Sequence, residues 1–281
     1  MTSGLDDVIA AETVLSEVDG RAGRLIIRGR SLDDLADSRY EGVIALLWAE
    51  LFTDGPDAQA LAAGLGAARA RVFDELRTID ERLLRLPPID VVRSLLARIE
   101  DGNDPATALN LVAAPAVFTP AVIRLARGLD PIPPDPMRPH AADMLAMLHG
   151  TVPAAELASA LDRYLVTAID HGLNASTFAA RVIASTQAGL ASASIGALCA
   201  LKGPLHGGAP GPILDMLDEI GRPERARPWI EKALARGERL MGFGHRIYRV
   251  RDPRADALKG ALQRLAQAGR LPTERLLLAE A

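Results

Sequence analysis

The chain has 281 residues and a formal net charge of −4, and its contents of apolar (49%) and charged residues (24%) are typical of a folded protein. This composition excludes a chain that is disordered throughout, and the lack of a basic excess argues against nucleic-acid binding. Alanine fills 49 positions and aromatic residues only 4%, which favours closely packed helices over a β-sandwich and predicts an all-α fold.

The first third of the chain begins with a short extended segment and then turns helical. Arg24 to Arg28 is an apolar run between two glycines, which predicts a strand or small hairpin. Ser31 is a candidate N-cap for a helix that begins at Leu32. Apolar residues at helical spacing then predict three further helices, over about 43–51, 57–73 and 74–86.

The middle of the chain continues this helical pattern. Helices are expected over about 89–99 and 105–126, the second interrupted by Pro115 and Pro120. Five prolines between 131 and 139 cannot continue a helix, and they predict a rigid surface loop inside one helical domain. Further helices are expected over 141–149 and 154–170.

Residues 182–201 form an uncharged stretch that is long enough to cross a bilayer as a helix. Five of its residues are Ser, Thr or Gln and most others are Ala or Gly, so its transfer into lipid would be poor. We therefore expect a buried helix or helix pair at a close packing interface and no membrane partner. Cys199 lies in this stretch and is expected to be a core residue. As the single cysteine, it excludes an intrachain disulfide and a cysteine-based zinc site.

A Gly- and Pro-rich break at 202–212 marks the sharpest change of composition. It predicts a large helical domain over residues 1–202 and a smaller domain over 203–281. Helices are expected near 212–221 and 227–239, and another is expected after Asp252, which would be its N-cap. The N-terminus has neither a basic nor an apolar leader region, so the expected location is cytoplasmic.

Three of the five histidines have neighbours that suggest a functional site. His140 and His149 are expected to be surface or helix-capping imidazoles. His171, His206 and His245 lie instead in Asp170-His-Gly-Leu-Asn-Ala-Ser-Thr177, Gly203-Pro-Leu-His-Gly-Gly-Ala209 and Met241-Gly-Phe-Gly-His-Arg246. Glycines beside a histidine let a ligand approach closely, and imidazole can transfer a proton near neutral pH. Spacing alone leaves functional and structural roles equally open for these three.

Other site types find little support in the sequence. The three histidines are not spaced as metal ligands on a helix, and no metal is expected. A Gly-x-Ser-x-Gly elbow and a Walker A motif are both missing. Gly242 and Gly244 lack the third glycine and the preceding strand of a dinucleotide site.

Whole segments of the chain resemble the citrate synthases and the closely similar 2-methylcitrate synthases. Leu201–Ala209 resembles their first catalytic-histidine loop, Met241–Arg254 the second, and Asp170–Thr177 their substrate-binding histidine segment. Gly23–Gly29, Asp33–Ala36 and Pro88–Arg93 resemble earlier family segments, in the family's order. The resemblance implies a helical two-domain homodimer that condenses acetyl-CoA with oxaloacetate, or propionyl-CoA in the methylcitrate variant. It implies a coenzyme A thioester as co-substrate and no permanently bound cofactor.

The resemblance also assigns roles to single residues. His206 matches the donor to the thioester carbonyl, and His245 matches the residue that polarises the ketone of oxaloacetate. His171 and Arg254 match groups that bind oxaloacetate. The coenzyme A contacts are matched by Arg249 and by the loop of Gly242, Phe243 and Gly244.

The sequence also departs from the family pattern. Gly172 stands where Glu is frequent, and Pro210-Gly211 stands where Asn-Glu is frequent. The family's aspartate base lies further downstream than Ala281, which implies a truncated small domain. The alternative to an enzyme is therefore an inactive citrate-synthase-like protein that binds ligand or a partner.

Overall fold

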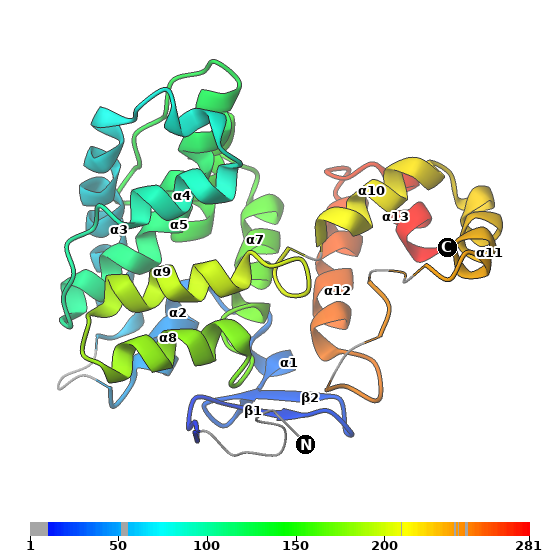
Figure 1. Ribbon diagram of the computed structural model, residues 1–281, viewed down its shortest axis with the longest axis horizontal. Coiled ribbons are helices and arrows are strands. Elements are labelled where there is room, and N and C mark those ends of the chain that lie inside the picture. The colour runs from blue at the N-terminus through cyan, green and yellow to red at the C-terminus, as the bar shows by residue number, and fades with distance from the viewer. Residues whose placement is uncertain (1–10, 52–55, 209, 239, 241, 245–246) are drawn as a thin grey trace, which may run out of the picture.

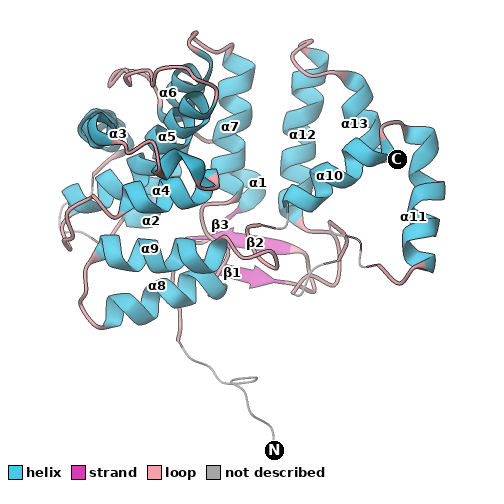
Figure 2. Ribbon diagram, turned by 45° about the horizontal axis from the view of Figure 1, so that its top comes forward, coloured by secondary structure: helices cyan, strands magenta, loops and turns pink. Residues whose placement is uncertain are grey.

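The computed structural model describes residues 11–51, 56–208, 210–238, 240, 242–244 and 247–281. Helices dominate these residues (Figure 2), and the small sheet near the N-terminus lies at the bottom of the view in Figure 1. The arrangement confirms the predicted all-α fold.

The sheet is built from three short antiparallel strands, β1 (Ser16–Asp19), β2 (Arg24–Ile27) and β3 (Arg30–Ser31). Val18 of β1 pairs with Leu25 of β2. Leu25 and Ile27 point into the core, where they pack with α1 (Leu32–Leu35) and α2 (Tyr40–Trp48). The predicted hairpin is confirmed, and Ser31 caps α1 as expected by accepting a hydrogen bond from the Asp34 amide.

Residues 57–86 form one long helix and two short 3₁₀ turns. Asp57 caps α3 (Ala58–Phe73), which agrees with the predicted alanine-rich helix. The helix predicted over 74–86 is wrong, because this segment forms η1 (Asp74–Thr78) and η2 (Leu83–Arg85). Between them the Asp80 carboxylate accepts a hydrogen bond from the Arg82 amide at 2.8 Å. Such a local turn competes with helical hydrogen bonds.

The central helix is α5 (Pro105–Ala126), and Pro115 and Pro120 do not interrupt it as predicted. Nine of its residues are buried, and α3, α4 (Pro88–Leu96) and α6 (His140–His149) pack around it. This burial offsets the backbone hydrogen bonds that proline cannot donate. In the part of the chain that is described, α5 alone has the length and apolar composition to cross a membrane, and here it is a core helix.

The uncharged stretch covers the end of α8 (Ala175–Ser185), the turn after it and all of α9 (Leu190–Leu201). The two helices pack closely, since a Cβ on Gly196 would lie 2.1 Å from Cδ1 of Ile183. The predicted close packing is confirmed, and burial of the stretch at an interface stays a prediction. Within this chain α8 buries no residue and α9 buries only Ala191 and Ala193. Cys199 is exposed rather than in the core, because it lies on the outer face of the pair.

The C-terminal helices are α10 (Pro210–Ile220), α11 (Ala226–Ala235), which follows the 3₁₀ turn η3 (Pro223–Arg225), α12 (Pro253–Gln267) and α13 (Thr273–Glu280). A small core of Ile220, Ala226 and Leu278 joins α10, α11 and α13. By contrast, α12 packs against α7 (Ala155–Thr167) of the N-terminal body. The domain boundary at 202/203 remains a prediction.

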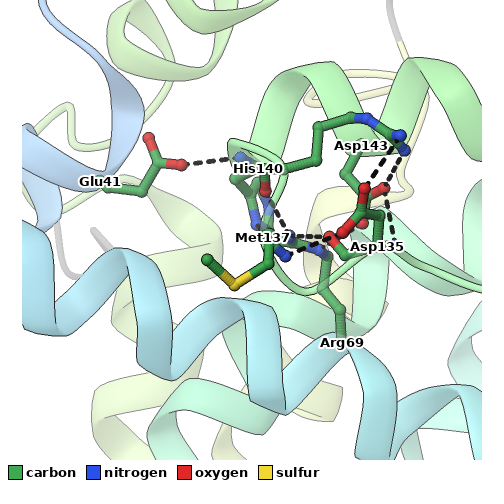
Figure 3. A network of polar contacts seen from close by, with 7 residues as sticks. Glu41, Arg69, Asp135, Met137, His140 and Asp143 are labelled. Atoms are coloured by element: carbon green, nitrogen blue, oxygen red, sulfur yellow. Dashed lines mark hydrogen bonds and ion pairs between the residues drawn. The ribbon is translucent and has the colours of Figure 1, made fainter. Parts of the chain in front are cut away.

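A buried polar network joins α3 to α6 and to the Pro-rich loop (Figure 3). The Arg69 side chain is only 1% exposed, and its Nε donates to Oδ2 of Asp143 at 2.8 Å. Its Nη1 lies 3.2 Å from Nδ1 of His140. The predicted surface role of His140 is therefore wrong: its ring is buried at the start of α6, and its amide donates to Oε1 of Glu41. His149 is exposed at the end of α6, next to Gly150, as expected.

The network predicts a measurable pH dependence of stability. Burial, followed by the charge of Arg69, lowers the pKa of His140 from 6.5 to about 3. The unfolded chain therefore binds a proton that the folded chain does not, so this group makes the folded state less stable as the pH falls from 6.5 towards 3. Burial raises the pKa of Asp162 to about 6, so Asp162 acts in the opposite direction between 3.8 and 6.

We therefore expect His140→Gln to lose less stability than the wild type between pH 7.5 and 4.5. Asp162→Asn should lose more, because it lacks the proton uptake that favours the folded state at low pH. Urea unfolding at both pH values measures each difference. Equal pH dependence in wild type and His140→Gln would contradict the assignment.

Candidate functional site

His171 lies in the loop between α7 and α8, and neighbouring side chains hold this loop in place. Asn174 caps α8 by accepting a hydrogen bond from the Thr177 amide at 3.0 Å. Gly172 has a φ of +65°, a conformation that glycine adopts at little cost. Nε2 of His171 lies 3.1 Å from the hydroxyl of Tyr248, and the two rings meet edge to face. A long-range contact thus orients the imidazole.

His206 lies in a tightly wound loop that follows α9. The Gly207 amide donates to the Leu201 carbonyl at 2.8 Å. A Cβ on Gly207 would lie 2.8 Å from that same oxygen, so the loop needs glycine there. Nε2 of His206 lies 3.0 Å from Oγ of Ser176, in the first turn of α8. This contact brings the His206 loop against the segment that carries His171.

Lys202 anchors the beginning of the His206 loop. Its Nζ lies 2.5 Å from Oδ1 of Asp90 in the first turn of α4. This hydrogen bond lowers the pKa of Asp90. The loop is therefore held to α4 through Lys202 and to α8 through His206.

The third contributing segment leads into α12. Tyr248 is 4% exposed, and burial raises its pKa to about 12, so the phenol stays protonated at neutral pH. Asp252 caps α12 as predicted and also binds the guanidinium of Arg254 through two nitrogens, Nη2 to Oδ2 at 2.6 Å and Nε to Oδ1 at 3.0 Å. A paired guanidinium keeps a fixed direction, which suits the recognition of a carboxylate.

The other predicted site residues are either exposed at the surface or lie outside the residues that the structure describes. Arg249 is exposed, and its amide donates to the Gly20 carbonyl at 2.7 Å. Gly242 and Gly244 have φ values of 92° and 78°, and Phe243 between them is exposed. This turn packs on α10, where a Cβ on Gly242 would lie 3.2 Å from Ile213. His245 lies outside the described residues.

The site thus combines one histidine from the α7–α8 loop, one from the loop after α9, a tyrosine from the segment leading into α12 and an arginine in the first turn of α12. Within the described ranges, no group of three His, Cys, Asp or Glu side chains is placed to hold a metal ion. The arrangement offers neutral and cationic hydrogen-bond donors, which suits an anionic substrate with a carbonyl group.

Comparison with known proteins identifies the family. Residues 4–280 match the family model described as citrate synthase, C-terminal domain. The chain is 38% identical to citrate synthase of Haloferax volcanii over 94% of this chain and 74% of that protein. It is 39% identical to 2-methylcitrate synthase of Mycobacterium tuberculosis over 93% and 69%. The chain belongs to the citrate synthase family.

A solved citrate synthase supports the same assignment. The ternary complex of the Thermoplasma acidophilum enzyme with carboxymethyl coenzyme A and oxaloacetate superposes with a TM-score of 0.81 at 27% identity, covering 98% of this chain and 75% of that one. Membership of the citrate synthase family confirms the predicted enzyme class, an acyltransferase of the citrate synthase type.

Sequence reasoning missed the contacts that support the citrate synthase histidines. Tyr248 and Ser176 both lie in segments that resemble the family, but no role was predicted for either from the sequence. Ser176 could have been noticed, because it is a polar residue five positions after His171 at the start of a helix. The contact between His171 and Tyr248 joins residues 77 positions apart, and no local pattern indicates it.

Proposed function

We propose that this chain condenses acetyl-CoA with oxaloacetate and that water then hydrolyses the thioester of the product, which releases citrate and coenzyme A. The observation that carries the proposal is the joining of three segments at one site, by the contacts of His171 with Tyr248 and of His206 with Ser176. The family supplies the reaction class, and the roles of the individual residues are proposed from the family resemblance with these contacts as support.

Oxaloacetate is a dianion, so its binding needs cationic or strong hydrogen-bond donors. We assign its carboxylates to His171 and Arg254. Asp252 fixes the plane of the Arg254 guanidinium through the two-nitrogen contact. Tyr248 orients His171, and its protonated hydroxyl adds no negative charge beside the substrate.

We assign the thioester carbonyl of acetyl-CoA to His206. Removing a proton from the methyl group moves charge onto the thioester oxygen, and a donor at that oxygen lowers the barrier. Ser176 keeps the His206 imidazole in one orientation. His245 is proposed to polarise the ketone of oxaloacetate. The family's aspartate base falls in the part of the relatives that this sequence does not cover.

The coenzyme A moiety is assigned to Arg249 and to the turn of Gly242, Phe243 and Gly244. Arg249 lines a surface pocket beside the β1–β2 turn together with Arg21, and the carboxylates of Glu17 and Asp19 line the same pocket. Phosphate groups bind arginine favourably. The 2-methylcitrate reaction with propionyl-CoA differs by one methylene, which is worth about 1–3 kcal/mol in an apolar pocket.

We also propose that the protein is a homodimer that associates through α8 and α9. The pair is uncharged between residues 182 and 201, yet within one chain it leaves Val182, Cys199 and Leu201 exposed. A face of this kind is typical of an interface. Light scattering measures the molar mass of the purified protein in solution and so distinguishes a dimer from a monomer.

His171→Ala tests the substrate assignment. We expect calorimetry to show oxaloacetate binding weakened about 10- to 100-fold, because hydrogen bonds to charged groups are worth about 1.5–3 kcal/mol. His149→Ala removes an exposed histidine and serves as the matched control. Equal affinities of His171→Ala and the wild type would contradict the assignment.

A thiol-release assay on protein of verified intact mass then distinguishes citrate synthase activity from 2-methylcitrate synthase activity and from an inactive binding protein. Release with oxaloacetate and acetyl-CoA supports the proposed reaction, and faster release with propionyl-CoA supports the methylcitrate variant. Oxaloacetate binding without any thiol release supports the inactive binding protein.

A further inference from the structure

The turn between β1 and β2 presses directly on the segment that carries Tyr248. The Gly20 carbonyl accepts the Arg249 amide hydrogen bond at 2.7 Å. A Cβ on Gly20 would lie 2.3 Å from the carbonyl oxygen of Ile247 and 2.8 Å from its carbonyl carbon. Gly23 is packed less tightly, since a Cβ there would lie 2.8 Å from Cγ2 of Val250 and 3.1 Å from the Arg251 carbonyl oxygen. At Gly20 the two backbones therefore meet at a distance that excludes any side chain.

The beginning of β1 contacts the other side of the site. The Ser16 hydroxyl donates to Oδ1 of Asp170, and its oxygen accepts the Gly172 amide at 2.9 Å. These two partners flank His171. One four-residue strand thus touches the loop of His171 at its first residue and, through the turn that follows it, the segment of Tyr248.

The strand pair is well suited to hold both partners. Leu25 and Ile27 of β2 are buried in the core of the N-terminal body. In the turn, Oδ1 of Asp19 accepts hydrogen bonds from the amides of Arg21 at 3.0 Å and Ala22 at 2.9 Å. The hairpin is therefore fixed at its base and closed at its tip. Figure 1 shows it at the bottom of the molecule, beside the loop that leads into α12.

We propose that the β1–β2 hairpin is a positioning element of the active site, with Gly20 as its decisive residue. Gly20 sets the place of the 247–251 backbone, and hence the distance from the Tyr248 hydroxyl to the His171 imidazole. Ser16 holds the His171 loop in place through its hydrogen bonds with Asp170 and Gly172. The inference rests on the proposed role of His171 in binding oxaloacetate.

Gly20→Ala tests the proposal, because its methyl group must push the Ile247 carbonyl away. We expect oxaloacetate affinity to fall about tenfold while kcat changes less, and amide hydrogen exchange in residues 247–251 to increase. Gly42→Ala is the matched control, since a Cβ there meets nothing within 4 Å. It should keep wild-type affinity and exchange.

Asp19 provides a second, clash-free variant in case Gly20→Ala does not fold. Asp19→Ala removes the acceptor of the turn and should weaken oxaloacetate binding about threefold, with faster exchange in 247–251. Asp19→Asn retains an acceptor oxygen and should restore both values.

Each outcome decides the proposal. Wild-type exchange in 247–251 for folded Gly20→Ala, or for Asp19→Ala, shows that the turn does not hold the segment. Faster exchange with unchanged affinity shows that the turn holds the segment without positioning the site. If the wild type binds no oxaloacetate, the proposed function fails, and the exchange comparison still decides whether the hairpin places the segment.

Discussion

His206→Ala is expected to lower the rate of thiol release about 100- to 1,000-fold, the usual cost of removing one donor from a developing oxyanion. His206 lies in a loop that glycines 207 and 208 hold tightly, and Ser176 is its described polar contact at 3.0 Å. Its side chain is half-buried and lies outside the cores around α5 and β2. The loss should therefore fall on kcat, with oxaloacetate affinity and melting temperature close to those of the wild type.

Two further variants interpret this result. Ser176→Ala keeps the imidazole and removes its orienting partner, so it should lose only part of the rate, about three- to tenfold for a hydrogen bond worth about 1 kcal/mol. His149→Ala should retain full activity. A large rise in the KM for oxaloacetate with unchanged kcat would place His206 in ground-state binding instead.

Local signals predicted the parts of the fold that depend on neighbours in sequence. Ser31 and Asp252 cap helices, as predicted, by accepting hydrogen bonds from amides three and two residues ahead. Such bonds need no tertiary partner, so the sequence alone can indicate them. For the same reason the β1–β2 hairpin, with its glycine-bounded apolar strand, was predictable.

Tertiary packing overrode local expectation elsewhere. Pro115 and Pro120 were expected to break α5, and neighbouring helices keep it continuous. His140 was expected at the surface, because a histidine beside prolines gives no sign of a buried arginine 71 positions away. Cys199 was expected inside, because an apolar helix does not reveal which of its faces this chain covers.

The candidate site, like the fold, could be predicted only where local sequence signals indicate it. The segments with His171 and His206 could be selected from their glycines and from the family resemblance, and the structure joins both segments at one place. The residues that fix the two imidazoles, Tyr248 and Ser176, were missed because each acts through a contact between distant segments.

The largest effect on stability is expected at Arg69. Its guanidinium binds Asp143 and donates from Nη2 to the carbonyls of Asp135 at 3.3 Å and Arg138 at 2.7 Å. The Pro-rich loop also packs on α3 itself, where a Cβ on Gly66 would lie 2.0 Å from the Pro136 carbonyl oxygen. Arg69 is therefore the polar link between α3, this loop and α6.

Arg69→Met should lower the free energy of unfolding by about 3–5 kcal/mol, because it removes the buried one of the two arginines paired with the Asp143 carboxylate and leaves only Arg138, at 3.0 Å. Arg71→Met, on the exposed face of the same helix, should stay within about 0.5 kcal/mol of the wild type. Adding Asp143→Leu to Arg69→Met removes the buried carboxylate as well, so the double variant should lose less than the sum of the losses of Arg69→Met and Asp143→Leu. Urea unfolding of the wild type, of the three single variants and of the double variant measures these differences. Strict additivity, or an Arg69→Met loss no larger than that of Arg71→Met, would show that the buried pair does not hold α3, the loop and α6 together.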